Sequence, residues 1–129
     1  MDKIKQFIYF IPIFILLLFF LPECSVLGKL AASVNINSWD QKLDTNTNKW
    51  TVYIFYTIQN TGEREFDYYS VLFMIRDEDG IEYREWDYGY YVDVGESVND
   101  SISKEIGEKK AEPPVVDDVI LDFPHSYGG

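Results

Sequence analysis

The sequence predicts an all-β fold, an antiparallel sandwich of six to seven strands preceded by one N-terminal hydrophobic helix. Three observations support this fold class. Apolar and polar residues alternate with a period of two over several runs, which is the pattern of half-buried strands. Clusters of Asn, Asp and Gly separate these runs, and helical periodicity is scarce after Lys29. Short strands divided by turn residues, with no helices between them, indicate an antiparallel sandwich or barrel.

The first 28 residues are expected to carry the chain to a membrane. Lys3 and Lys5 precede an uncharged apolar run over residues 7–21. A positively charged start followed by such a run is typical of a secretory signal peptide. As a helix the run covers ~22 Å, which is shorter than the ~30 Å hydrocarbon core of a bilayer. Residues 1–28 are therefore predicted to be either a signal peptide that is cut after Gly28 or an N-terminal membrane anchor.

Cys24 offers a third fate for this leader. A cysteine just after an apolar run resembles the acylated cysteine of bacterial lipoproteins, so Cys24 is a candidate lipidation site. Small residues normally precede that cysteine, and Pro22 and Glu23 do not fit this pattern. All three fates place the domain outside the cytoplasm, and the leading lysines give the same orientation by the positive-inside rule. The domain is expected to be extracytoplasmic, secreted or membrane-anchored at the cell surface, and to meet the membrane through its N-terminal segment.

Six segments have the alternation of strands. The best defined segment lies at residues 50–58. Every second residue in it, starting from the first, is apolar and is expected to face the core: Trp50, Val52, Ile54, Tyr56 and Ile58. The predicted strands cover residues 30–38, 50–58, 66–76, 81–91, 98–106 and 115–123.

Turn chemistry separates these strands. An Asn-Thr-Gly turn follows the second strand, and residues 77–80 predict a hairpin turn in which Gly80 can take a positive φ. The prolines at positions 113 and 114 forbid a helix and break a central strand, so they indicate a crossover at a sheet edge. Residues 29–125 are therefore predicted to form one immunoglobulin-like β-sandwich domain, and residues 126–129 a disordered tail.

The net charge lies in the domain. From Lys29 onward Asp and Glu far outnumber Lys and Arg, and the chain carries a formal net charge of −11. This charge excludes nucleic acid as a partner, because each phosphate contact needs a cation. A partner that is steered by charge is expected to be basic. Solubility or adaptation to high salt explains the acidic surface without any partner.

Residues that bind metals or form cross-links are scarce. Cys24 is the single cysteine and His125 the single histidine, which excludes an internal disulfide and a zinc site. Residues 44–48 place oxygen side chains at every second position, as calcium loops do, but Lys49 stands where an EF-hand needs glycine. His125 lies near the tail without the context of a general base. The sequence therefore predicts no metal, no cofactor and no catalytic residue.

Three motifs together resemble one known family. They are Asn60-Thr61-Gly62 after a strand, Phe73-Met74-Ile75-Arg76-Asp77 before Asp79-Gly80, and Val94-Gly95-Glu96 before a later strand. This set resembles the FxLyD family, with Phe73 and Asp77 at the name-giving positions and with the usual Leu, Tyr and Pro replaced. The resemblance implies a small extracytoplasmic immunoglobulin-like domain that acts as an accessory or binding module and has no catalytic residues.

Aromatic residues crowd the stretch 83–91, and four of them form the candidate binding surface: Tyr83, Trp86, Tyr88 and Tyr90. In strand register, Trp86, Tyr88 and Tyr90 share a face with Val92 and Val94, which favours burial of that face in the core. If the face is exposed instead, it would suit a glycan or a protein, because aromatic rings supply a large contact area at low entropic cost.

Taken together, these features predict a non-catalytic protein and not an enzyme. The leading hypothesis is a binding or structural module that acts at the cell envelope or surface on a protein or envelope partner. The alternative is a carbohydrate or small-ligand binder that uses the stretch 83–91, which coplanar exposed rings would favour. In an exported domain, the tripeptide Asn99-Asp100-Ser101 makes Asn99 a candidate glycosylation site.

Overall fold

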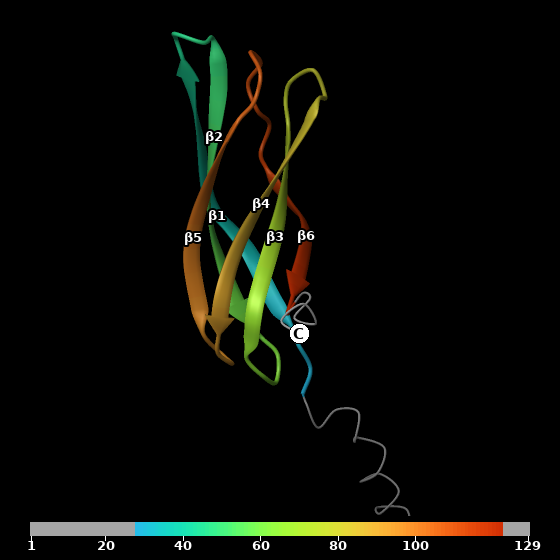
Figure 1. Cartoon of the computed structure of the whole chain (residues 1–129). Helices are drawn as coiled ribbons and strands as arrows, with labels where there is room; N and C mark the ends of the chain where they lie inside the picture. The colour runs from blue at the N-terminus through green and yellow to red at the C-terminus, as the bar shows by residue number, and fades with distance from the viewer. Residues whose placement is uncertain (1–27, 123–129) are drawn as a thin grey trace, which may run out of the picture.

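Residues 28–122 are described by the computed structural model and contain six strands and no helix. The strands are β1 (Ala32–Asp44), β2 (Lys49–Asn60), β3 (Phe66–Arg76), β4 (Glu82–Val92), β5 (Ser97–Glu105) and β6 (Val115–Leu121). They pair antiparallel in two three-stranded sheets of order β1-β2-β5 and β4-β3-β6. The sheets pack face to face as a sandwich (Figure 1). The predicted all-β antiparallel fold is confirmed.

Several predictions fall on residues outside the described part of the chain. They are the leader helix, which lies outside it over residues 1–27, the lipidation site at Cys24, His125 and the tail of residues 126–129. Between residues 28 and 122, no helix is long and apolar enough to cross a membrane.

The core lies between the central strands β2 and β3. The face predicted for the second strand is buried from Val52 to Ile58, with Val52, Ile54, Tyr56 and Ile58 at most 1% exposed, and Trp50 is half-buried against it. The facing residues of β3 are equally buried: Tyr69, Val71, Phe73 and Ile75. Tyr56 packs against Phe73 across the two sheets, with ring centroids 4.9 Å apart. Because both strands are paired on each side, their inner faces are fully removed from water.

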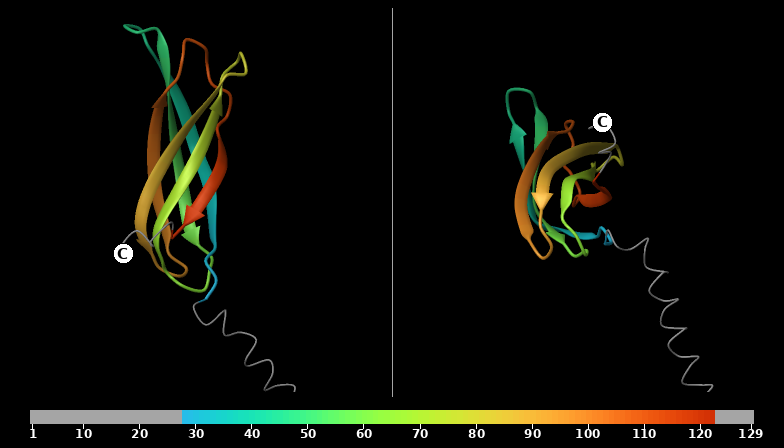
Figure 2. Two further views of the ribbon diagram at one scale, coloured as in Figure 1. Left: turned by 45° about the vertical axis from the view of Figure 1, so that its right-hand side comes forward. Right: turned by 60° about the horizontal axis from the view of Figure 1, so that its bottom comes forward.

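Strand β1 is longer than the predicted strand over residues 30–38. A bulge between Ile36 and Ser38 shifts its register against β2, so that Asn37 has no partner there. After the bulge the inner positions become Trp39 and Gln41, which are half-buried. An extra residue inverts the alternation of side chains, which is why the pattern in the sequence ends at residue 38. The hairpin of β1 and β2 continues to one end of the sandwich (Figure 2).

The connector between β5 and β6 passes from one sheet to the other. The side chain of Gln41 holds it to β1: the amide nitrogen donates to the carbonyl of Ala111 at 3.2 Å, and the amide oxygen accepts from the N–H of Ala111 at 2.8 Å. Pro113 and Pro114 follow, in the segment where the sequence indicated a crossover. The chain then enters β6, an edge strand of its sheet.

Asp77 organises the hairpin between β3 and β4 and is only 1% exposed. Its Oδ1 accepts hydrogen bonds from the N–H groups of Asp79 at 2.9 Å and Ile81 at 3.0 Å, while Gly80 takes a φ of 83°. Asp77→Ala removes this acceptor from two partly buried N–H donors, so the free energy of unfolding should fall by about 1.5 kcal/mol. Urea unfolding of the full-length protein measures the loss. Asp77→Asn keeps the oxygen and should lose less; equal losses for the two variants would contradict this account.

Candidate functional site

An aromatic surface covers the outer face of the β4-β3-β6 sheet. Tyr68, Trp86, Tyr88 and Tyr90 form it, and we call these four residues the tyrosine face. Register pairs Tyr68 with Tyr90 and places Trp86 opposite Leu72. Tyr88 is 53% and Tyr90 66% exposed, whereas Tyr68 and Trp86 are half-buried. These side chains alternate with the core residues of the same strands, so they point away from the core.

The predicted burial is wrong for Tyr88 and Tyr90, which are exposed, while Trp86 on the same face is half-buried. The inner positions of β4 are the intervening ones, and Tyr83 packs against the core from there. Tyr91 has a positive φ of 56°, which reverses the side of the sheet to which the next residue points. Val92 is therefore buried, although by alternation it would share the face of the exposed Tyr88 and Tyr90. A left-handed residue breaks the period-two rule, which is why counting from Val92 gave the wrong face. Three of the four predicted residues therefore lie together, and Tyr83 does not.

The exposed rings are tilted against one another. Tyr68 lies 6.1 Å from Tyr88 with an interplanar angle of 32°, and 5.6 Å from Tyr90 with an angle of 58°. Tyr91, which is 69% exposed, continues the row at 6.3 Å from Tyr90 and 41°. The rings are exposed, as a binding surface requires, but they are not coplanar. A row of tilted rings suits an uneven partner better than the flat face of an extended glycan.

Carboxylates border the tyrosine face, and the nearby cations are paired. Arg84 contacts Glu82 at 3.2 Å and Asp117 at 3.2 Å, and Arg76 contacts Glu82 at 2.6 Å. Asp118 stands opposite Leu72 on the edge strand.

Near Tyr91, desolvation and the carboxylates of Asp93 and Asp67 raise the pKa of Glu65. A carboxyl whose pKa is raised by like charges indicates crowded negative charge. This end of the sheet therefore has a negative potential that attracts cations.

A second polar group lies inside the sandwich, where β4 and β5 run side by side (Figure 1). The Tyr56 hydroxyl donates a hydrogen bond to Oδ2 of Asp87, and Asp100 of β5 lies near the same carboxyl group. Burial first and the bond to Asp87 second raise the pKa of Tyr56, so Tyr56 stays a donor. Burial and Asp100 raise the pKa of Asp87, whereas the Tyr56 bond lowers it.

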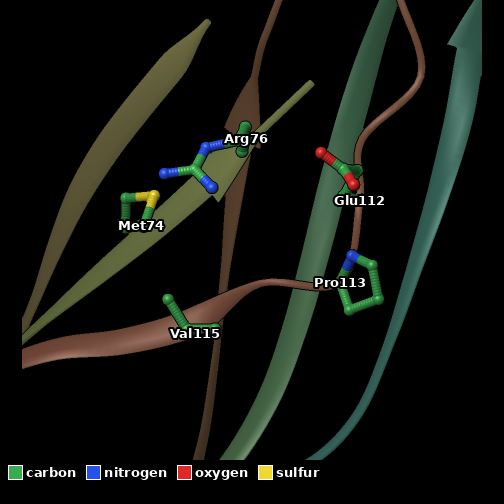
Figure 3. A pocket seen from close by; sticks show the side chains of 5 residues that line it. All are labelled: Met74, Arg76, Glu112, Pro113 and Val115. Carbon is green, nitrogen blue, oxygen red and sulfur yellow. The ribbon is translucent and has the colours of Figure 1, made fainter. Parts of the chain in front are cut away.

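The concave regions are shallow. One of about 170 Å³ lies where β6 begins and is lined by Met74, Arg76, Glu112, Pro113 and Val115 (Figure 3). Its cation, Arg76, is already paired with Glu82. Another of about 310 Å³ lies on the outer face of the β1-β2-β5 sheet. Among residues 28–122 no three Asp, Glu, His or Cys side chains gather as metal ligands.

The candidate glycosylation residue Asn99 lies on the outer face of β5 and is exposed. Its Oδ1 accepts a hydrogen bond from the Thr57 hydroxyl at 2.6 Å. Asn99 thus belongs to a row of polar side chains that crosses the whole sheet. Sequence reasoning missed this row, because its members come from three strands.

No family model matches the chain, and no curated protein matches it. Solved structures do show similarity. The ApaA protein from Bordetella pertussis has 15% identity and a TM-score of 0.44, over 73% of this chain and 92% of that one. The Northeast Structural Genomics Consortium target SoR45 has 10% identity and a TM-score of 0.42, over 73% of this chain and 84% of that one. Neither similarity indicates what this chain does.

Proposed function

We propose that this protein is a non-catalytic extracytoplasmic binding module that recognises a protein partner with its tyrosine face. The single observation that supports this most is the exposure of Tyr88 and Tyr90 beside Tyr68 and Trp86 on one sheet. Surface tyrosines in a group are costly to leave in water and are typical of binding sites. The leader of residues 1–28 would secrete or anchor the module.

The finer fold assignment is part of the proposal. We infer an immunoglobulin-like sandwich, in which β1, β2 and β5 correspond to strands A, B and E, and β4, β3 and β6 to strands C′, C and F. The strand orders β1-β2-β5 and β4-β3-β6 support this correspondence. The motifs that resemble the FxLyD family act in turns here: Asn60 accepts from the N–H of Gly62 at 2.9 Å, and Asp77 closes its hairpin.

The partner we expect is a protein with a basic patch. Tilted rings with hydroxyl groups pack against irregular side-chain surfaces, and such tyrosines are frequent hot spots. The bordering carboxylates would attract Lys and Arg, which also bind over tyrosine rings by cation–π contacts. Glu82 and Asp117 are already paired with Arg76 and Arg84. The carboxylates available to a basic partner are therefore those crowded at the end of the sheet near Tyr91: Glu65, Asp67 and Asp93. Glycan binding on the same face remains the alternative, although the angles of 32° and 58° argue against a flat platform.

Site-specific photo-crosslinking of the full-length protein in its native membrane tests this function. A benzoyl-phenylalanine at position 88 should crosslink to one discrete protein, which mass spectrometry then identifies. The same probe at Tyr53 serves as the matched control, because Tyr53 lies on the outer face of the other sheet.

The double variant Tyr88→Thr/Tyr90→Thr should weaken binding of the identified protein by at least about 30-fold, as the loss of hot-spot residues does. Threonine keeps the β-propensity of both positions. Added salt should weaken the complex too, since the carboxylates would contribute to it. Equal crosslinking from positions 88 and 53, or crosslinks to glycan alone, would contradict the proposal.

A further inference from the structure

A row of neutral polar side chains crosses the outer face of the β1-β2-β5 sheet. Asn35, Thr57 and Asn99 are register neighbours on the three strands, and the bulged Asn37 joins them. We call these four residues the amide row. The amide of Asn35 donates to Oδ1 of Asn37 at 3.1 Å, Nδ2 of Asn37 donates to the Thr57 hydroxyl at 2.7 Å, and that hydroxyl donates to Oδ1 of Asn99 at 2.6 Å.

The direction of these bonds leaves donors at one end. The first bond joins two residues of β1, and the next two run from β1 through β2 to β5, so Asn99 only accepts within the row. No hydrogen bond from Nδ2 of Asn99 is made to any residue between 28 and 122. Oδ1 of Asn35 is likewise an acceptor at the opposite end. The row therefore holds its amides in place and still presents a donor end and an acceptor end to solvent.

The bulge in β1 lies within this row. Asn35 and Asn37 are two residues apart, so simple alternation places both on the outer face of the sheet. The register shift between Ile36 and Ser38 leaves Asn37 without a register partner on β2, exposed beside Asn35. Bulges re-aim side chains and are frequent beside functional sites. One ladder position is given up here, and the side chain of Asn37 bonds to Asn35 and Thr57 on the outer face.

An apolar ring lies next to the amide row. Phe55 is 46% exposed and stands between Ser38 and Ser101 in the register. The depression of about 310 Å³ is lined by Asn37, Phe55, Tyr56, Asn99, Asp100 and Ser101. A phenylalanine on an outer face has no solubility role. The chain has a net charge of −11, and solubility alone would favour charged side chains at exposed positions over four neutral ones in one row.

We propose that this depression binds a neutral hexopyranose unit of a glycan. Phe55 would lie against the apolar C–H face of the sugar ring, and the amide groups of Asn37 and Asn99 would bind its hydroxyls. Planar amides offer a donor and an acceptor side by side, which matches vicinal hydroxyl pairs. An apolar surface with a few fixed polar groups is the general composition of small-molecule sites. The amide row contains no charged side chain that could form an ion pair with a charged ligand.

An array of neutral oligosaccharides built from glucose, galactose, mannose and N-acetylglucosamine tests this site on the full-length protein. At least one should bind. Phe55→Thr and, separately, Asn99→Asp should each weaken its binding by about tenfold, because they remove the stacking ring or an amide donor. Both positions are exposed strand positions, so circular dichroism should show that these variants stay folded.

Tyr88→Thr/Tyr90→Thr is the matched control on the opposite sheet, and it should bind the glycan unchanged. This control separates the two proposals, since loss of the protein partner leaves the sugar site intact. An array without any binding overturns the sugar site. A glycan whose binding survives Phe55→Thr and Asn99→Asp, or is lost only with the tyrosine variant, overturns it as well.

Discussion

Gly89→Ala is expected to lower the free energy of unfolding by about 3 kcal/mol, because a Cβ there would overlap a fixed aromatic ring. Gly89 stands directly opposite Tyr69 in the register of β3 and β4. The ring atoms and the hydroxyl of Tyr69 occupy the place that a Cβ would take. Tyr69 is only 2% exposed and packs edge-on against Phe66, with centroids 6.1 Å apart, so it has no space to yield.

Thermal unfolding followed by circular dichroism measures this effect. A loss of this size should lower the melting temperature by about 15 °C in a domain of this length. The double variant Gly89→Ala/Tyr69→Leu should recover part of the loss, because the smaller side chain removes the overlap. A melting temperature of Gly89→Ala within a few degrees of the parent would show that the ring can move aside.

Tyr56→Phe should cost about 2 kcal/mol at pH 7, the second largest effect we expect. Tyr56 is fully buried, and its hydroxyl is the donor that reaches Oδ2 of Asp87. Phenylalanine keeps the packing against Phe73 but leaves the Asp87 carboxylate without this donor. Because the bond is strongest to the ionised carboxylate, the loss should be smaller at pH 4 than at pH 7.

The pH dependence follows from the direction of the Asp87 shift. Burial and Asp100 raise the pKa of Asp87 above its ordinary value of 3.8 in the folded state. The folded protein therefore binds more protons than the unfolded chain over the interval between the two pKa values. This contribution to stability is complete below the ordinary pKa and is lost as pH rises through the raised one.

Asp87→Asn removes the titrating group from the pair. Urea unfolding from pH 4 to pH 7 should then show a smaller fall in stability with rising pH than the parent shows, and Tyr56→Phe a larger one. The salt bridge between Glu85 and Lys104, at 3.3 Å on the same pair of strands, is present in all three proteins and serves as a constant background. An unchanged slope in Asp87→Asn would assign the pH dependence to other carboxyls.

Asn60 makes one hydrogen bond that the sequence predicts and one that it does not. Its role in the turn was readable, because Asn before Thr-Gly favours a bond from its side chain to the nearby backbone, and Oδ1 indeed accepts from Gly62 at 2.9 Å. The same side chain also donates to the carbonyl of Val92 at 2.8 Å. That partner is 32 residues away. Local chemistry predicts the first bond, and only the folded chain defines the second.

The two candidate surfaces depended on the fold to different degrees. Three of the four residues of the tyrosine face were visible as a cluster in one strand, and Tyr68 of β3 was not. The exposure of the cluster was predicted wrongly, because the positive φ at Tyr91 reverses the face to which the following residue points. The amide row was not visible at all, since Asn35, Thr57 and Asn99 lie on three strands. Both depend on registers, and a register is a long-range property.

The sequence by itself determined the strands, the hairpin at Asp77, the crossover at the prolines and the buried face of β2, because alternation and turn propensity act over a few residues. Tertiary structure alone decided which strands pair, where β1 bulges, which face of β4 meets water and which side chains meet across the outer faces. Those outcomes minimise exposed apolar area over the whole sandwich, and no short segment holds that information.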